Sequence, residues 1–157
     1  MALLSWKKDV IAIGYDLFID GNLVGEIKNE RLSSNSYVKV NGRKYFFESE
    51  GLRHKVINVI DMKSRKQIGK IVFNFWRTKA SIALFDKEFM WKSDNFFYRK
   101  WSIYSTANNP LIRSKLYKGD SYEINNEVDE LLLFCGIVTL VRRRNNGLSR
   151  LLFFFFF

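Results

Sequence analysis

The hydrophobic positions between about residues 10 and 124 fall into short segments, separated at close intervals by turn residues. Asp20-Gly21 and Asn41-Gly42 each lie between two apolar-rich arms, which is typical of a β-hairpin. At residues 79–84, apolar side chains alternate with polar or small ones, as in a half-buried strand. No segment before residue 124 shows a sustained helical period. The pattern therefore predicts about nine to twelve short antiparallel strands, as in a sandwich or barrel.

One segment near the C-terminus breaks this pattern. Eleven consecutive residues, Leu131 to Val141, carry no charge and a single hydroxyl. Carboxylates precede the segment and three arginines follow it, which is the charge order that a helix dipole favours. With Asn125 and Asn126 as N-terminal caps, we predict a helix over about residues 127–144, roughly 27 Å long. Its middle is apolar on every face, which predicts burial on all sides.

An apolar segment of this kind raises the alternative of a membrane anchor, but its length argues against one. A spanning helix needs about 20 apolar residues, whereas this segment offers eleven. A barrel of short antiparallel strands has an interior that must be filled, and its height is close to the length of such a helix. We therefore predict a mainly β fold: a closed antiparallel β-barrel with a buried hydrophobic C-terminal helix through its centre. The predicted core residues of that helix are Leu131, Leu132, Leu133, Phe134, Cys135, Ile137, Val138, Leu140 and Val141.

The chain of 157 residues has the length of one domain. We expect a single domain over residues 1–146 and an apolar tail at 147–157. The tail ends in five phenylalanines, which need a groove, a membrane or another chain to cover them. The other interpretation is that the tail is disordered and incidental.

Charge narrows the class of partner. Lysine and arginine number 26 against 16 acidic residues, and this excess favours phosphates on lipid headgroups or nucleic acid, or acidic proteins. Basic residues gather in and after the predicted turn at 61–66, and again at 97–118, where aromatic residues are interleaved and acidic ones are absent. Such a surface suits anionic headgroups, and we favour these over nucleic acid; a solvated basic face is the alternative. The candidate headgroup-binding residues are Lys63, Arg65, Lys66, Lys70, Arg99, Lys100, Arg113 and Lys115.

Catalytic chemistry is poorly represented. His54 is the only histidine and Cys135 the only cysteine, and this cysteine lies in the apolar helix segment, where a thiol is usually inert. These two residues leave a zinc site short of ligands, and no glycine-rich phosphate loop is present. Acidic residues at 120–130 are interpreted as helix-start charges rather than a cation site. We predict no enzyme, no metal and no cofactor.

Three stretches carry a family resemblance: DMKSRKQIGKI at 61–71, KEFMWKS at 87–93 and NEVDELLLFCGIVTLV at 126–141. Together with many short strands before an apolar helix, they resemble the tubby C-terminal-like superfamily, which includes LURP-one-related proteins and phospholipid scramblases; this chain would be a divergent, bacterial-type member. The resemblance implies a twelve-stranded barrel around a central helix, and binding of phosphoinositides or association with membranes. Cysteine-rich and proline-rich segments of the scramblases are missing here, so their activity is not implied.

We therefore expect a non-catalytic module for an anionic ligand, with a membrane phospholipid or phosphoinositide headgroup as the leading candidate. The alternatives are a structural or protein-interaction domain without a small ligand, and a C-terminally membrane-anchored protein. The N-terminus shows no export signal and the lone cysteine suits a reducing compartment. We expect a cytoplasmic protein, peripheral at the inner membrane surface if it binds lipid. Protein partners and the oligomeric state stay open.

Overall fold

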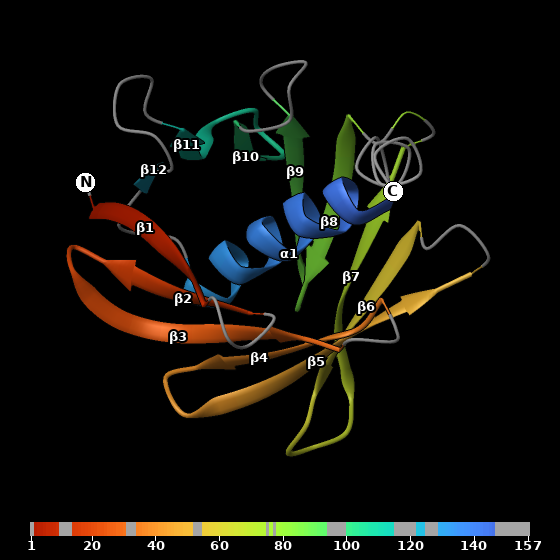
Figure 1. The fold of residues 1–157 in the computed structure, drawn as a ribbon. Coiled ribbons are helices and arrows are strands. Elements are labelled where there is room, and N and C mark those ends of the chain that lie inside the picture. The colour runs from red at the N-terminus through yellow and green to blue at the C-terminus, as the bar shows by residue number, and fades with distance from the viewer. Residues whose placement is uncertain are drawn as a thin grey trace, which may run out of the picture.

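The computed structural model describes residues 2–9, 14–30, 34–51, 55–74, 76, 78–93, 100–114, 122–124 and 129–146. These residues form β-strands followed by one helix (Figure 1). The elements are β1 (Ala2–Asp9), β2 (Gly14–Ile19), β3 (Asn22–Asn29), β4 (Ser36–Val40), β5 (Arg43–Glu50), β6 (Val56–Asp61), β7 (Gln67–Phe73), β8 (Lys79–Leu84), β9 (Lys87–Ser93), β10 (Trp101–Ser105), β11 (Pro110–Ser114), β12 (Tyr122–Ile124) and α1 (Glu130–Asn146).

Each strand pairs antiparallel with its neighbour in the chain, and β12 pairs back with β1. The turns explain this order, because several have the backbone that a tight hairpin requires. Asp20 and Gly21 have φ angles of 50° and 81°, and Asn41 and Gly42 have 49° and 80°. Positive φ at both central residues is the geometry of a type I′ turn, which suits the twist of paired strands. The hairpins predicted at these two positions are confirmed by the β2–β3 and β4–β5 pairing.

The predicted closed barrel with a helix through its centre needs correction. The body of the fold is one strongly curved antiparallel sheet of ten strands, β2 to β11, and α1 lies obliquely across its concave side rather than along the axis of a regular barrel (Figure 1). The two edges of this sheet meet only through β1 and the short β12, which pairs through three residue pairs on each side. Hydrophobic alternation predicts which face of a strand is buried, but it carries no information about strand length at a seam.

The helix bounds also differ from the prediction. The helix begins at Glu130 rather than near residue 127, and it ends at Asn146 rather than 144. Asp129 provides the cap, since its carboxylate accepts a hydrogen bond of 2.8 Å from the backbone N–H of Leu131. The predicted caps, Asn125 and Asn126, lie outside the described residues, as does the tail at 147–157. No helix in the part of the chain that the structure describes is long and apolar enough to cross a membrane.

The core lies between the concave side of the sheet and α1. Every side chain from Leu131 to Val141 that we predicted in the helix core is buried. Burying one large apolar side chain contributes about 1.5–3 kcal/mol, so the helix supplies a major part of the core. The strands meet it with alternating inward residues, among them Val38, Phe47, Val59, Ile71, Ile82 and Ile103.

Arg142 departs from the interpretation of the three arginines as charges at the end of the helix. Its side chain is buried, and its Nη2 donates a hydrogen bond of 2.9 Å to Ser36 Oγ. That hydroxyl in turn donates to Asn29 Oδ1 at 2.6 Å. Burial lowers the pKa of Arg142 to about 10, against the opposing effect of the Glu30 carboxylate, so it stays charged at neutral pH. Arg142 thus joins the last turns of α1 to β3 and β4.

Candidate functional site

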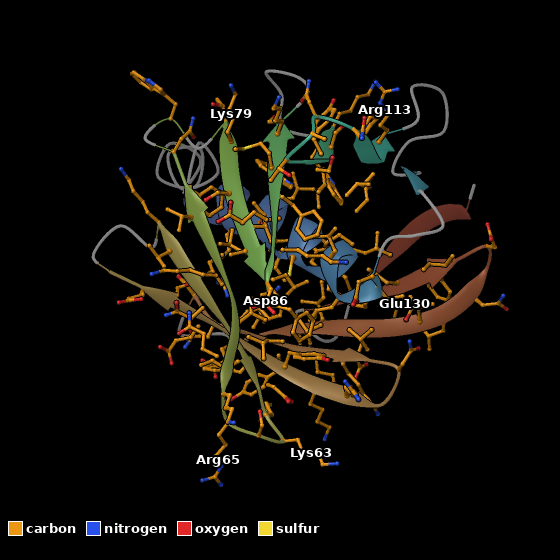
Figure 2. All side chains as sticks on the ribbon, turned by 180° about the vertical axis from the view of Figure 1, so that it is seen from behind. Lys63, Arg65, Lys79, Asp86, Arg113 and Glu130 are labelled. Atoms are coloured by element: carbon orange, nitrogen blue, oxygen red, sulfur yellow. The ribbon has the colours of Figure 1, made fainter. Side chains whose placement is uncertain are left out.

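The predicted basic residues divide between two ends of the molecule. Figure 2 shows Lys63 and Arg65 at the tip of the β6–β7 hairpin, and Arg113 at the opposite end together with Lys79. Lys66 is exposed beside the first pair, and Lys70 is exposed further along β7. Lys100 is half-buried just before β10, whereas Arg99 and Lys115 lie outside the described residues. One continuous headgroup site containing all the predicted residues is therefore not formed.

A groove of about 470 Å³ lies on the convex face of the sheet over β8, β9 and β10. Its lining combines basic, hydroxyl and apolar side chains. The residues that line it include Lys79, Ser81, Phe89, Met90, Lys92, Ser105, Thr106 and Asn108. The alternation of the strands produces this surface, since Ala80, Ile82 and Trp91 are buried while their neighbours face outward.

Strand register places three cations of this face in one row. Lys79 on β8 is directly opposite Lys92 on β9. Lys92 is opposite Ser102 on β10, and Ser102 is opposite Arg113 on β11. Side chains directly opposite on neighbouring antiparallel strands have Cβ atoms about 4.5–5.5 Å apart. The row therefore concentrates positive charge along one line across four strands, with a serine between two of the cations.

The two lysines form an unfavourable pair when no ligand is present, because like charges directly opposite destabilise a sheet. In the described part of the chain, neither ammonium group is in ion-pair contact with a carboxylate. Lys92 Nζ instead lies 4.9 Å from the centroid of the Tyr104 ring, which is a cation–π contact. An anion between the two ammonium groups would relieve their repulsion.

The groove is asymmetric along its length. Glu88 lines it four residues from Lys92 on the same strand, about 13 Å away at roughly 3.3 Å per residue. An anion is therefore attracted to the lysine end of the groove and repelled from the Glu88 end.

Near the lysine end, Trp76 in the loop before β8 is 76% exposed. A tryptophan with one apolar body and one polar N–H is well suited to a membrane–water interface.

Tyr104 belongs to the aromatic residues interleaved with the predicted basic stretch at 97–118, whereas Lys79 and Lys92 were not among the predicted binding residues. The missing information was the β8–β9 turn, which consists of Phe85 and Asp86 and fixes the register by pairing Leu84 with Lys87. Phe85 has a φ of 54°, which is uncommon for a bulky residue, so the turn lacks the usual glycine or asparagine signature. Once a two-residue turn is placed at 85–86, counting back along both strands gives the lysine pair directly.

The described residues that were considered for catalysis or metal binding have structural roles instead. Cys135 is buried, and this burial, together with the Asp129 carboxylate, raises the pKa of its thiol far above the usual range. Asp129 caps α1, and Glu130 accepts a hydrogen bond from Asn41 Nδ2. No cluster of histidine, cysteine or acidic side chains suited to a metal ion occurs among the described residues. His54 lies outside them.

Comparison with known proteins gives a likeness of fold. No family model matches the sequence, and no curated protein matches it. An X-ray structure of the Arabidopsis thaliana protein AT5G01750 superposes with a TM-score of 0.66 at 14% sequence identity, covering 89% of this chain and 89% of that one. At this identity the similarity concerns the fold alone.

Proposed function

We propose that this chain is a non-catalytic module that binds a phosphate-bearing ligand in the β8–β10 groove. The observation that carries the proposal is the direct opposition of Lys79 and Lys92. Like charges held opposite one another cost stability, and such a violation of a local rule is expected where function requires it. A phosphate between the two ammonium groups would accept charge-assisted hydrogen bonds from both.

The surroundings of the pair favour a phospholipid headgroup over free phosphate. Ser81 and Ser105 offer hydroxyls along the groove, and Met90 offers apolar surface. Arg113 continues the positive row, and the exposed Trp76 precedes Lys79 by three residues. This combination of cations and an exposed aromatic residue suits an anionic bilayer surface. The corresponding location is peripheral, at the cytoplasmic side of a membrane.

Membership of the tubby C-terminal-like superfamily is a further part of the proposal. It is supported by the chain order of the strands and by the apolar C-terminal helix that the sheet encloses on its concave side. Because phosphoinositides are among the ligands expected for that superfamily, they belong in the set of lipids to be tested. The groove is formed by its own residues, whether or not the chain belongs to that superfamily.

The test is titration of the protein with glycerol 3-phosphate, inorganic phosphate and phosphatidylcholine vesicles containing phosphatidylserine or a phosphoinositide. We expect Lys79→Gln/Lys92→Gln to weaken binding of glycerol 3-phosphate by at least about tenfold, because each charge-assisted hydrogen bond contributes about 1.5–3 kcal/mol. The matched control is Lys63→Gln/Lys66→Gln, which changes the net charge equally at the other end of the molecule.

Equal losses of glycerol 3-phosphate binding in the two double variants would show that net charge alone drives binding and would overturn the groove. Equally tight binding of inorganic phosphate and of vesicles would identify free phosphate as the ligand in place of a lipid. Failure of every probe to bind at low salt would leave the structural or protein-interaction alternative.

A further inference from the structure

The β6–β7 hairpin ends in a turn built to hold its basic side chains away from the protein. We call residues 61–66 the β6–β7 finger. Both carboxylate oxygens of Asp61 are used within it: Oδ1 accepts from the N–H of Lys63 at 3.2 Å, and Oδ2 accepts from the Ser64 hydroxyl at 3.0 Å. The N–H of Arg65 donates to the Asp61 carbonyl at 2.7 Å. The only acidic residue of the finger is therefore committed to the turn.

The finger presents one apolar side chain among cations. Met62 is 42% exposed, and the side chains of Lys63, Arg65 and Lys66 are exposed around it. The N–H of Met62 donates to the carbonyl of Lys44 at 3.1 Å, which brings β5 alongside the finger. Lys44 is exposed and lies next to Met62 in the cross-strand row. The finger thus has the composition of a surface that enters the headgroup region of an anionic bilayer, where cations meet phosphates and a flexible apolar side chain reaches the acyl boundary.

Its position separates it from the groove. Lys63 and Arg65 point away from the body of the molecule at one end, whereas Lys79 and Arg113 lie at the other (Figure 2). A single flat membrane cannot contact both ends at once. The two basic surfaces are therefore either alternatives for one partner or sites for two.

We propose that the β6–β7 finger is a second docking surface for an anionic bilayer, with Met62 in the interface, and that the protein uses its two ends to bridge two anionic membrane surfaces. The docking of the finger rests on its own residues, while the bridging rests also on the proposed function of the groove. Bridging requires the groove to bind one membrane and the finger to bind the other, so it is lost when either the groove or the finger is disabled.

The experiment uses the full chain and phosphatidylcholine vesicles that contain phosphatidylserine, with co-sedimentation for binding and light scattering for clustering of vesicles. Each cation near such a surface strengthens partitioning about fivefold, so we expect Lys63→Gln/Lys66→Gln to weaken finger docking by about 25-fold. The measurement is made in a Lys79→Gln/Lys92→Gln background, where the groove does not contribute. The matched control is Lys28→Gln/Lys87→Gln, which removes two exposed lysines outside both surfaces.

We expect the wild-type protein to cluster vesicles. The Lys63→Gln/Lys66→Gln variant and the Lys79→Gln/Lys92→Gln variant should each still bind vesicles but should not cluster them. The Met62→Gln variant tests insertion at constant charge and should weaken partitioning severalfold. A control variant that loses as much binding as the finger variant, or a Met62→Gln variant that partitions like wild type, would overturn the docking of the finger. If glycerol 3-phosphate fails to bind while the Lys63→Gln/Lys66→Gln variant still loses vesicle binding, the groove is not a phosphate site but the docking of the finger is supported. If wild-type protein binds vesicles without clustering them, the proposed bridging is wrong.

Discussion

The indole ring of Trp101 lies against Gly136, so that β10 and the middle of α1 approach where the helix has no side chain. A Cβ atom added at Gly136 would overlap the ring, lying 2.6 Å from Trp101 Cη2, and would lie 3.0 Å from Ile103 Cδ1. Trp101 is itself completely buried. The glycine is therefore required by the packing between the sheet and the helix, and not by a turn.

We expect Gly136→Ala to destabilise the protein by about 1–3 kcal/mol, the usual cost of overpacking a filled core. Urea unfolding followed by circular dichroism would measure this loss. Trp101→Phe removes the ring atoms that the new methyl group would meet, so adding it to Gly136→Ala should cost less than the sum of the two single changes. Strict additivity would show that the ring does not restrict residue 136.

A charge on the buried face of the helix should unfold the protein. Leu133 and Val138 are 1% and 2% exposed. Leu133→Asp or Val138→Asp would bury an unpaired carboxylate at a cost of several kcal/mol, comparable with the total stability of a small domain. The matched control is Leu23→Asp, because Leu23 is 63% exposed. Near-native circular dichroism and thermal unfolding of either helix variant would contradict the buried position of α1.

The Cys135 thiol should be unreactive in the folded protein. Burial raises the pKa of this thiol, so the folded protein keeps the proton that the unfolded chain loses near about pH 8.5. The folded state then binds more protons above that pH, and stability should fall there by up to about 1.4 kcal/mol per pH unit. Urea titrations between neutral and alkaline pH would show this slope, and Cys135→Ala should remove it. Rapid labelling of the native protein by a thiol reagent would contradict the prediction.

The lysine pair of the groove should cost stability in the absence of ligand. Replacing Lys79 by glutamine removes one of two like charges that lie opposite each other. We expect Lys79→Gln to raise the free energy of unfolding by about 0.2–1 kcal/mol at low salt, and by less at high salt, where the repulsion is screened. Lys28→Gln is the control, since Lys28 is mostly exposed and faces Glu26 at 3.8 Å. No gain in Tm at low salt would show that the lysines do not repel one another in the folded state.

Strands and turns could be predicted where the residue type itself favours the local backbone conformation. Asp20-Gly21 and Asn41-Gly42 have side chains that accept positive φ, so the turn chemistry can be read locally. Phe85 takes the same kind of backbone without any such signal, and the groove that depends on its turn was missed. The apolar run of α1 predicted burial, but not its oblique path or the short seam at β12, because those depend on how the strands meet in space.

The distribution of charge illustrates a second limit. Successive hairpin turns lie at alternate ends of an antiparallel sheet, so the end at which a basic residue lies depends on a correct count of the strands before it. Lys63 and Arg113 were grouped by their chemistry, whereas the strand order separates them. Residue type predicted that the surface is basic; only the topology shows that the basic residues within the described ranges lie in separate regions at two ends of the molecule.

The position of α1 after all the strands has a consequence for synthesis of the protein. The inward residues of β2 to β11 are all translated before the helix that covers them. At about 5–20 residues per second, the growing chain carries an uncovered apolar sheet for several seconds. The native core can form only when translation has passed Val141, so we expect chaperones that recognise apolar strands to associate with the nascent chain and to release it once the helix has emerged.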